Sequence, residues 1–218
     1  MSNNEPLAFR MRPKTLEEYV GQEHVLGKDK ILYRTIKADR LSSIILFGPP
    51  GCGKTSLARV ISETTKYKFY KINAVTAGVA DIKKVVEETK NFMLNPSGKS
   101  ILFIDEIHRF NKLQQDALLP YVENGTIILI GATTENPYFE VNKALISRSM
   151  VIKLNPLTNE DIYKILKNAL KRNDGLGEYN IKIEDETLRK IATISNGDVR
   201  TALNGLEVAT LTTTMSED

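Results

Sequence analysis

A glycine-rich segment in the first quarter of the chain has the residue types and the spacing needed to bind phosphate. Residues 48–55 read G-P-P-G-C-G-K-T and directly follow the apolar run 44–47. When a buried strand breaks into such a loop and the loop opens a helix, successive backbone N–H groups point at one place. Lys54 is then placed to reach the β- and γ-phosphates of a nucleotide and Thr55 to bind Mg²⁺, while glycines let the backbone approach without a Cβ. We predict a P-loop here rather than an ordinary glycine-rich turn, with nucleotide contacts from Gly48, Pro49, Pro50, Gly51, Cys52 (through its N–H alone), Gly53, Lys54, Thr55 and Ser56.

Two adjacent acidic residues follow a second apolar run, 100–104, and form the second candidate for chemistry. A carboxylate at the end of a buried strand beside the P-loop strand can hold Mg²⁺ through water, and the next residue can act on a water molecule. We therefore predict that Asp105 joins Thr55 in binding the metal and that Glu106 polarises the attacking water. Small-molecule P-loop kinases take their nucleophile from the substrate, so this pair favours hydrolysis. The alternative is an acidic pair that ends a strand by chance.

Apolar runs of strand length alternate with segments of helical period over most of the chain. The runs are 44–47, 68–72, 100–104, 126–130 and 151–154, and the helical segments are 56–61, 80–92 and 113–122. Strands that are apolar throughout and alternate with helices predict an α/β domain with a parallel sheet covered on both faces. Such a sheet brings the carboxyl ends of its strands, and hence both motifs, to one edge.

The pattern changes after Asn155 to helices alone. Thr158 and Asp161 have the spacing of a helix-capping pair, and further helices are predicted over 185–194 and 198–211. These segments predict a small helical lid that follows the α/β domain.

Composition agrees with this organisation. A chain of 218 residues with 41% hydrophobic and 26% charged residues can bury one sizeable core and a small second one. One cysteine excludes an intramolecular disulfide and suggests a reducing compartment. No apolar stretch approaches the roughly 18 residues of a membrane span, and residues 1–5 are too polar for a signal peptide, so we expect a cytoplasmic protein.

Charge is distributed unevenly along the chain. Residues 157–218 hold 8 Lys/Arg against 11 Asp/Glu, whereas residues 1–156 hold 22 against 16. The basic excess of the first part permits a polyanionic partner, although a solvated surface of mixed charge explains it equally simply.

Several strings, taken together, resemble AAA+ ATPases of the clamp-loader type. They are the P-loop, the Asp105-Glu106 pair, G-A-T-T-E-N-P (131–137), I-S-R-S (146–149) and G-D-V-R (197–200). Four strings are similar to the replication-associated recombination proteins (RarA/MgsA), which are related to the Werner-helicase-interacting protein. They are P-L-A-F-R-M-R-P (6–13), V-G-Q-E-H (20–24), D-E-I-H-R-F-N-K (105–112) and A-T-T-E-N-P (132–137). The resemblance extends from about Pro6 to about Leu211; Holliday-junction motors share the A-T-T element but not these strings.

The resemblance implies a fold and a division into domains. It implies a five-stranded parallel sheet of strand order 5-1-4-3-2 between helices, followed by an all-α lid. Residues 1–25 would form an N-terminal linker and adenine-pocket segment, residues 26–155 the P-loop ATPase domain, and residues 156–218 the lid. The helical oligomerisation domain that usually follows is expected to be absent from this chain.

It also implies catalytic roles at single positions. Thr134 matches sensor 1, which hydrogen-bonds near the γ-phosphate or the lytic water, and Thr133 takes its place if the register differs by one. Arg148 matches the arginine finger that reaches the neighbouring subunit's nucleotide. Arg200 matches sensor 2, which closes the lid over the phosphates of its own subunit. The alternatives are that Thr133 and Thr134 merely favour a strand, that Arg148 is a surface arginine, and that Arg200 caps or solubilises its helix.

Further positions carry binding roles by the same resemblance. Val20, Gly21 and Gln22 match the segment that lines the adenine pocket. Asn73 matches the polar residue that holds the catalytic glutamate away from its water; a plain strand-end turn residue is the alternative. DNA contacts are expected from Lys83 and Lys84, which equally fit a solvated helix face, with Arg109 and Lys112 as the next candidates. For His24 and His108, surface or packing roles are favoured over metal binding or acid–base chemistry.

The resemblance implies an ATP- and Mg²⁺-dependent ATPase that acts on single-stranded, gapped or forked DNA at stalled replication forks, in recombination and repair. Expected partners are replication and repair proteins such as single-strand-binding protein. The full-length protein is expected to form homo-oligomers, and this chain is expected to be a monomer. The expected location is the cytoplasm, in association with the nucleoid. Alternatives are a nucleotide-gated, loader-like subunit with little hydrolysis, a Holliday-junction-type motor, and a P-loop kinase, against which Glu106 and Arg148 argue.

Overall fold

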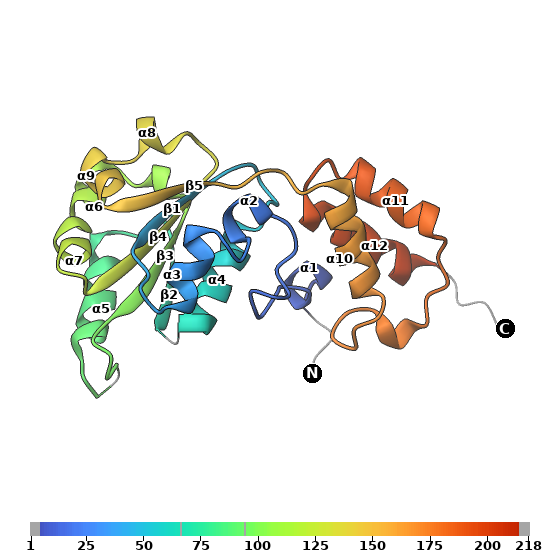
Figure 1. The fold of residues 1–218 in the computed structure, drawn as a ribbon, viewed down its shortest axis with the longest axis horizontal. Coiled ribbons are helices and arrows are strands. Elements are labelled where there is room, and N and C mark those ends of the chain that lie inside the picture. Colours follow the sequence, from blue (N-terminus) through green and yellow to red (C-terminus); the bar gives the residue numbers. More distant parts are fainter. Residues whose placement is uncertain (1–4, 66, 94, 214–218) are drawn as a thin grey trace.

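A five-stranded parallel sheet forms the centre of the larger part of the molecule, and a bundle of helices forms the smaller part (Figure 1). This computed structural model describes residues 5–65, 67–93 and 95–213. The strands are β1 (Ser43–Phe47), β2 (Lys68–Asn73), β3 (Ser100–Asp105), β4 (Ile127–Thr133) and β5 (Ser149–Lys153). Their order in the sheet is β2-β3-β4-β1-β5 and every pair is parallel, which confirms the predicted order.

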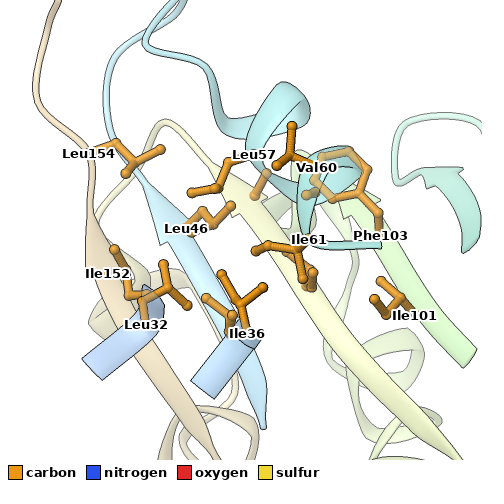
Figure 2. Close-up of a cluster of buried hydrophobic side chains, with 14 of the residues drawn as sticks. Leu32, Ile36, Leu46, Leu57, Val60, Ile61, Ile101, Phe103, Ile152 and Leu154 are labelled. Atoms are coloured by element: carbon orange, nitrogen blue, oxygen red, sulfur yellow. The ribbon is translucent and has the colours of Figure 1, made fainter. Parts of the chain in front are cut away.

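The three central strands, β1, β3 and β4, are almost wholly buried because both faces of the sheet are covered, whereas the edge strands β2 and β5 carry lysines and are more exposed than the pattern of throughout-apolar strands predicts. Successive residues of a strand point to opposite faces, so Ile44 and Leu46 join one buried cluster while Ile45 joins the other. Figure 2 shows the first cluster, in which side chains of β1, β3 and β5 meet Leu32 and Ile61 from two covering helices.

Helices lie on both faces. The first face is covered by α3 (Ile31–Lys37) and α4 (Lys54–Thr65), and the second by α5 (Val79–Lys90), α6 (Lys112–Asp116), α7 (Leu119–Glu123) and α9 (Lys143–Ser147). The short helices α2 (Glu23–Leu26), η1 (Ile107–Arg109) and α8 (Pro137–Glu140) lie in the connections.

The single helix predicted over 113–122 is instead two short helices, α6 and α7. Pro120 stands in the first turn of α7. A proline has no N–H to continue the hydrogen bonds of a preceding helix but fits the first turn of a new one. The helical period therefore located the segment correctly and missed the break.

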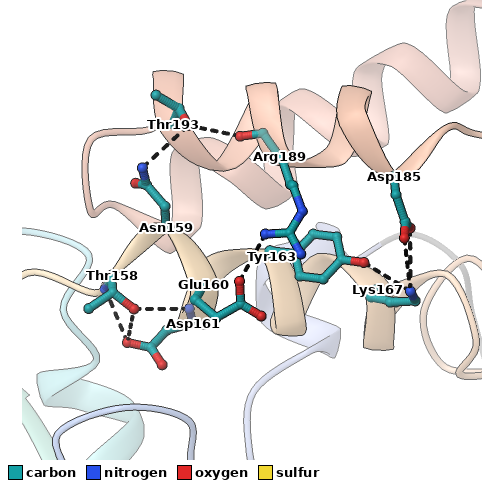
Figure 3. A network of polar contacts seen from close by, with 9 residues as sticks. All are labelled: Thr158, Asn159, Glu160, Asp161, Tyr163, Lys167, Asp185, Arg189 and Thr193. Atoms are coloured by element: carbon teal, nitrogen blue, oxygen red, sulfur yellow. Dashed lines mark hydrogen bonds and ion pairs between the residues drawn. The ribbon is translucent and has the colours of Figure 1, made fainter.

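The smaller part consists of α10 (Asn159–Ala169), η2 (Gly177–Tyr179), α11 (Asp185–Ile194) and α12 (Val199–Thr212) around a third buried cluster. The predicted capping pair is present, since Thr158 Oγ1 accepts from Asp161 N at 3.1 Å and Asp161 Oδ2 accepts from Thr158 N at 3.1 Å. Figure 3 shows how α10 and α11 are joined: Arg189 donates to Glu160 at 2.9 Å and lies 4.1 Å from the ring centre of Tyr163.

The N-terminal segment packs with the lid through α1 and with the first sheet cluster through Leu16 and Tyr19. Helix α1 (Leu7–Arg10) buries Leu7 in the third cluster, and Arg10 forms an ion pair with Glu207 of α12 at 2.9 Å. The chain thus leaves the lid after α1, passes the P-loop and enters the sheet, so this segment connects both parts. Within the described ranges, no helix is both long and apolar enough to cross a bilayer.

Candidate functional site

The P-loop lies at the carboxyl edge of the sheet, between β1 and α4, as predicted. Gly51 and Gly53 have φ of +72° and +97°, a left-handed conformation that favours glycine. Lys54 is buried, and its Nζ donates to the carbonyl oxygens of Gly48 at 2.7 Å and Pro49 at 2.8 Å. The lysine therefore lies inside the loop that would surround a phosphate.

Two neighbours hold the loop from outside. A Cβ on Gly51 would collide with Asp198, the residue that caps α12, and a Cβ on Gly53 would collide with the hydroxyl of Tyr19. That hydroxyl donates to Gly53 O at 3.2 Å, and burial raises the pKa of Tyr19. The N-terminal segment and the lid thus both touch the phosphate-binding loop.

The acidic pair follows β3, which is separated from β1 by β4 alone. Asp105 ends the strand and its Oδ2 lies 3.6 Å from Lys71 Nζ. Glu106 has φ of +54°, a strained conformation for a residue with a Cβ, and such strain clusters at functional sites. Its Oε2 lies 3.3 Å from His108 Nδ1.

The two threonines at the end of β4 differ in position. Thr133 is fully buried, its carbonyl accepts from Gly48 N at 3.2 Å, and its Oγ1 lies 2.8 Å from His108 Nδ1. Thr134 is exposed beyond the strand end. The geometry therefore brings Thr133 next to both the P-loop and the acidic pair, and leaves Thr134 at the surface.

Asn73 ends β2 in register with Asp105. Its Oδ1 accepts from Val75 N at 2.9 Å, within its own turn. The structure thus places Asn73 beside the acidic pair, but the side-chain oxygen has a local partner.

A cavity lies between the P-loop, the N-terminal segment and the lid, and Val20 lines it. Gly21 and Gln22, the two residues that follow Val20 in the chain, are buried. Gln22 accepts from Asn155 N at 2.9 Å and donates to Asn155 O at 2.7 Å, which holds the junction between sheet domain and lid. The lining is mostly apolar and includes Met11, Pro13, Tyr19, Leu157, Val199 and Leu203.

Arg200 and Arg148 lie at different ends of the molecule. Arg200 is in the first turn of α12, and its N–H donates to the Asp198 carboxylate that meets Gly51. Arg148 precedes β5, at the amino edge of the sheet, where it pairs with Glu123 at 2.8 Å. Because the strands are parallel, Arg148 is one strand length away from the P-loop of its own chain.

The four candidate DNA contacts, Lys83, Lys84, Arg109 and Lys112, are all exposed. Gln114 Nε2 donates to Ala77 O at 3.1 Å, which joins the first turn of α6 to the loop before α5. The four basic residues therefore come from neighbouring elements on one face of the sheet.

Three features of the site were missed from sequence. Tyr19 and the lid residues Leu157 and Val199 reach the cavity only through tertiary packing. Arg12 also lines it, and burial together with the guanidiniums of Arg200 and Arg59 lowers the pKa of Arg12. The sequence favours a packing or surface role for His108, and the structure places its imidazole beside Glu106 and Thr133.

The side chains present fit a nucleotide with Mg²⁺. Thr55 and Asp105 supply hydroxyl and carboxylate oxygens, the ligand types that Mg²⁺ prefers. Among the described residues no group of three His, Cys, Asp or Glu side chains is arranged to hold a metal. Mg²⁺ at nucleotide sites usually takes one or two protein ligands together with phosphate and water.

Comparison with known proteins gives two family matches. Residues 11–158 match the family described as the Holliday junction DNA helicase RuvB P-loop domain. Residues 178–211 match the family described as the RCF1/5-like, AAA+ ATPase lid domain.

Several curated proteins are similar to nearly the whole chain. Replication-associated recombination protein A of Coxiella burnetii is 51% identical over 211 residues, which cover 95% of this chain and 47% of the relative. The protein of the same name from Bacillus subtilis is 49% identical over 214 residues, 98% of this chain and 50% of the relative. ATPase WRNIP1 of Dictyostelium discoideum is 46% identical over 204 residues, 94% of this chain and 23% of the relative. The chain spans about half the length of the bacterial relatives.

A solved structure supports the same assignment. The Thermotoga maritima RuvB Holliday junction branch migration motor is 29% identical, with a TM-score of 0.72 over 89% of this chain and 63% of that one. The chain therefore belongs to the AAA+ ATPase family with a RuvB-type P-loop domain, and its predicted relationship to the RarA/MgsA replication-associated recombination proteins is confirmed.

Proposed function

We propose that this chain is the ATP-binding and ATP-hydrolysing part of a longer protein that acts on DNA at stalled or damaged replication forks. One observation supports hydrolysis above all others. The P-loop, Asp105 and Glu106 lie at the same edge of the sheet, at the ends of β1 and β3 with β4 between them. A phosphate chain in the loop would have the acidic pair beside its terminal phosphate.

The chemistry follows from these positions. The loop N–H groups and Lys54 bind the phosphates, and Glu106 accepts a proton from a water molecule whose oxygen forms a bond to the γ-phosphorus. The bond between that phosphorus and the bridging oxygen breaks, and its electron pair leaves with ADP, so the products are ADP and phosphate. When bound by Thr55 and, through water, by Asp105, Mg²⁺ supplies charge neutralisation at the phosphate oxygens.

The family resemblance gives the remaining site residues their proposed roles. Thr134, or Thr133 in view of its position beside the P-loop, acts as sensor 1. Arg200 acts as sensor 2 in its own subunit, and Arg148 acts in the neighbouring subunit. Val20, Gly21 and Gln22 belong to the adenine pocket, and Asn73 restrains the glutamate.

We also propose the division into residues 1–25, 26–155 and 156–218, of which residues 1–4, 66, 94 and 214–218 lie outside the described residues. Contact of α1 with the lid supports a connecting role for the first of these segments.

The DNA partner is single-stranded, gapped or forked. Lys83, Lys84, Arg109 and Lys112 would line a channel when several subunits surround one strand, since their elements share one face of the sheet. The relatives named replication-associated recombination protein A support a role in recombination and repair. Proteins such as single-strand-binding protein are proposed partners, and the nucleoid in the cytoplasm is the proposed location.

Phosphate release tests the proposal. Steady-state ATP turnover is measured for this chain and for the full-length protein, each with single-stranded, gapped and forked DNA. We expect DNA-stimulated turnover by the full-length oligomer and slow turnover by this chain, because Arg148 is expected to act across a subunit interface. Tight ATP binding by the full-length protein without turnover on any DNA would instead identify a nucleotide-gated, loader-like subunit. Preferential stimulation by four-way junctions would identify a junction motor.

A further inference from the structure

His108 connects the catalytic glutamate to the end of the neighbouring strand. Its Nδ1 lies 3.3 Å from Glu106 Oε2 and 2.8 Å from Thr133 Oγ1. The His108 side chain is 10% exposed, against 35% for the Glu106 side chain. Among the described residues, His108 is the one whose side chain makes a polar contact with the Glu106 carboxylate.

The two partners of the imidazole differ in how firmly they are held. Thr133 is fully buried, its carbonyl is bonded to the P-loop at Gly48 N, and its hydroxyl oxygen accepts from Glu135 N at 3.0 Å. Glu106 lies after the strand in a left-handed conformation, with its carboxylate partly exposed. His108 Nδ1 therefore lies between a hydroxyl oxygen that is fixed to the sheet and a carboxylate that, in the proposed function, must reach a water molecule.

A single ring nitrogen makes both contacts, and this limits what they can do together. If Nδ1 carries the proton, it can donate to the Glu106 carboxylate or to the Thr133 hydroxyl, but it favours one of them. If Nδ1 is bare, it accepts from the Thr133 hydroxyl, and the carboxylate has no donor there. The contact that His108 Nδ1 can offer to Glu106 thus depends on the arrangement at the end of β4, next to the P-loop.

We propose that His108 is a positioning residue for Glu106, which ties the orientation of the carboxylate to the end of β4 and so to the state of the phosphate-binding loop. The proposal rests on the proposed function, in which Glu106 acts on the attacking water. The contact of His108 would be a second restraint, additional to the one proposed for Asn73, whose side-chain oxygen is bonded to Val75 N in this structure.

Three substitutions in the full-length protein separate positioning from packing. The amide nitrogen of Asn can take the place of Nδ1, whereas that of Gln takes the place of Nε2, and Ala removes both. We expect His108→Ala to lower kcat for ATP on the order of tenfold, the usual scale for losing a residue that orients a reacting group. KM and the affinity for ADP should stay within about twofold, because the P-loop contacts are unchanged.

His108→Asn should recover most of the rate, and His108→Gln should behave as His108→Ala does. Lys182→Ala is the control: Lys182 is exposed on the lid and has no part in the proposed site, and this variant should keep the full rate. Melting temperatures of all variants report folding.

The outcomes are distinct. Unchanged kcat in His108→Ala overturns the proposal, and so does an equal loss in the Ala and Asn variants that parallels a fall in melting temperature, since that pattern belongs to packing. If the unsubstituted protein binds ATP without hydrolysing it, or if Glu106→Gln keeps the full rate, the proposed function itself fails and the role of His108 fails with it.

Discussion

Asp198 of the lid lies against Gly51 of the P-loop, in the space that a Cβ on Gly51 would occupy. The same carboxylate accepts from the backbone N–H of Arg200 at 2.8 Å and of Thr201 at 3.4 Å, so it caps α12 while it touches the loop. The start of the lid helix is therefore in direct contact with the phosphate-binding loop, and Arg200 lies two residues from that contact.

This contact predicts that Gly51→Ala destabilises the protein more than its backbone conformation alone requires. Gly125 is a matched control, because it has the same φ of +72° but no atom within 4 Å of a Cβ placed on it. The left-handed conformation costs an alanine about 1–2 kcal/mol at either position. Urea unfolding without nucleotide should show a larger loss of stability for Gly51→Ala than for Gly125→Ala. Equal losses would mean that the lid does not touch the loop in solution.

Lys54→Ala and Glu106→Gln should separate ATP binding from hydrolysis. Lys54 contacts phosphate in the ground state, so Lys54→Ala should weaken ATP binding by about 1.5–3 kcal/mol, the range for a charge-assisted hydrogen bond. Glu106 acts on water in the transition state, so Glu106→Gln should keep the affinity and lower kcat by roughly 10²- to 10⁴-fold. Nucleotide titration and phosphate release measure the two effects. Similar affinity losses in both variants would contradict this division of roles.

Arg200→Ala and Arg148→Ala should differ in a monomer. Arg200 lies two residues after Asp198, which touches Gly51 of the P-loop in the same chain, so its loss should weaken nucleotide binding even at high dilution. Arg148 lies at the opposite edge of the sheet and pairs with Glu123, so its loss should leave monomer affinity unchanged. In the oligomer, Arg148→Ala should lower kcat by about 10³-fold or more, as is usual for arginine fingers. Titration at concentrations that keep the chain monomeric checks the first part, and weaker binding of Arg148→Ala there would exclude a role across the interface.

Replacement of both Lys83 and Lys84 by Ala in the full-length protein should weaken DNA binding and flatten its salt dependence. For every phosphate that the protein no longer neutralises, the slope of log K against log salt becomes shallower by about 0.7 to 0.9. Lys164 and Lys171, exposed on the lid, form a control pair with the same change of charge. ATP affinity should be unchanged in both double variants. An unchanged slope for the Lys83 and Lys84 double variant would indicate that DNA binds elsewhere, with Arg109 and Lys112 as the next residues to test.

The stability that the ionised Asp174 carboxylate contributes to the fold should be lost at low pH. Its hydrogen bonds with Arg172, one of them 2.7 Å long, lower the pKa of Asp174 to about 2. A depressed pKa in the folded state contributes stability above the unfolded value, near 3.8, and this contribution is lost as the pH falls toward 2. Asp174→Asn should therefore be less stable than the unsubstituted chain at pH 7, and the difference should shrink below about pH 4. Thermal unfolding across this range measures it; a constant difference would assign the effect to something other than ionisation.

The sequence by itself determined the elements whose signals are local. Apolar runs at β1, β3 and β4 identify strands covered on both faces because successive residues point to opposite sides. The glycine spacing of residues 48–55 identifies the P-loop because the left-handed turns at Gly51 and Gly53 require glycine. The predicted strand order came from family resemblance rather than from the pattern, since periodicity does not say which strands are neighbours.

Only the tertiary structure decided the contacts between distant segments. Thr133 rather than Thr134 contacts His108 beside the acidic pair because the register of β4 against β3 places it there, and a one-residue shift would exchange the two. Thr133 and His108 are 25 residues apart in sequence, and Asp198 meets Gly51 only because the lid docks on the loop. Such contacts depend on how whole elements pack, and no short-range pattern of residue types encodes that packing.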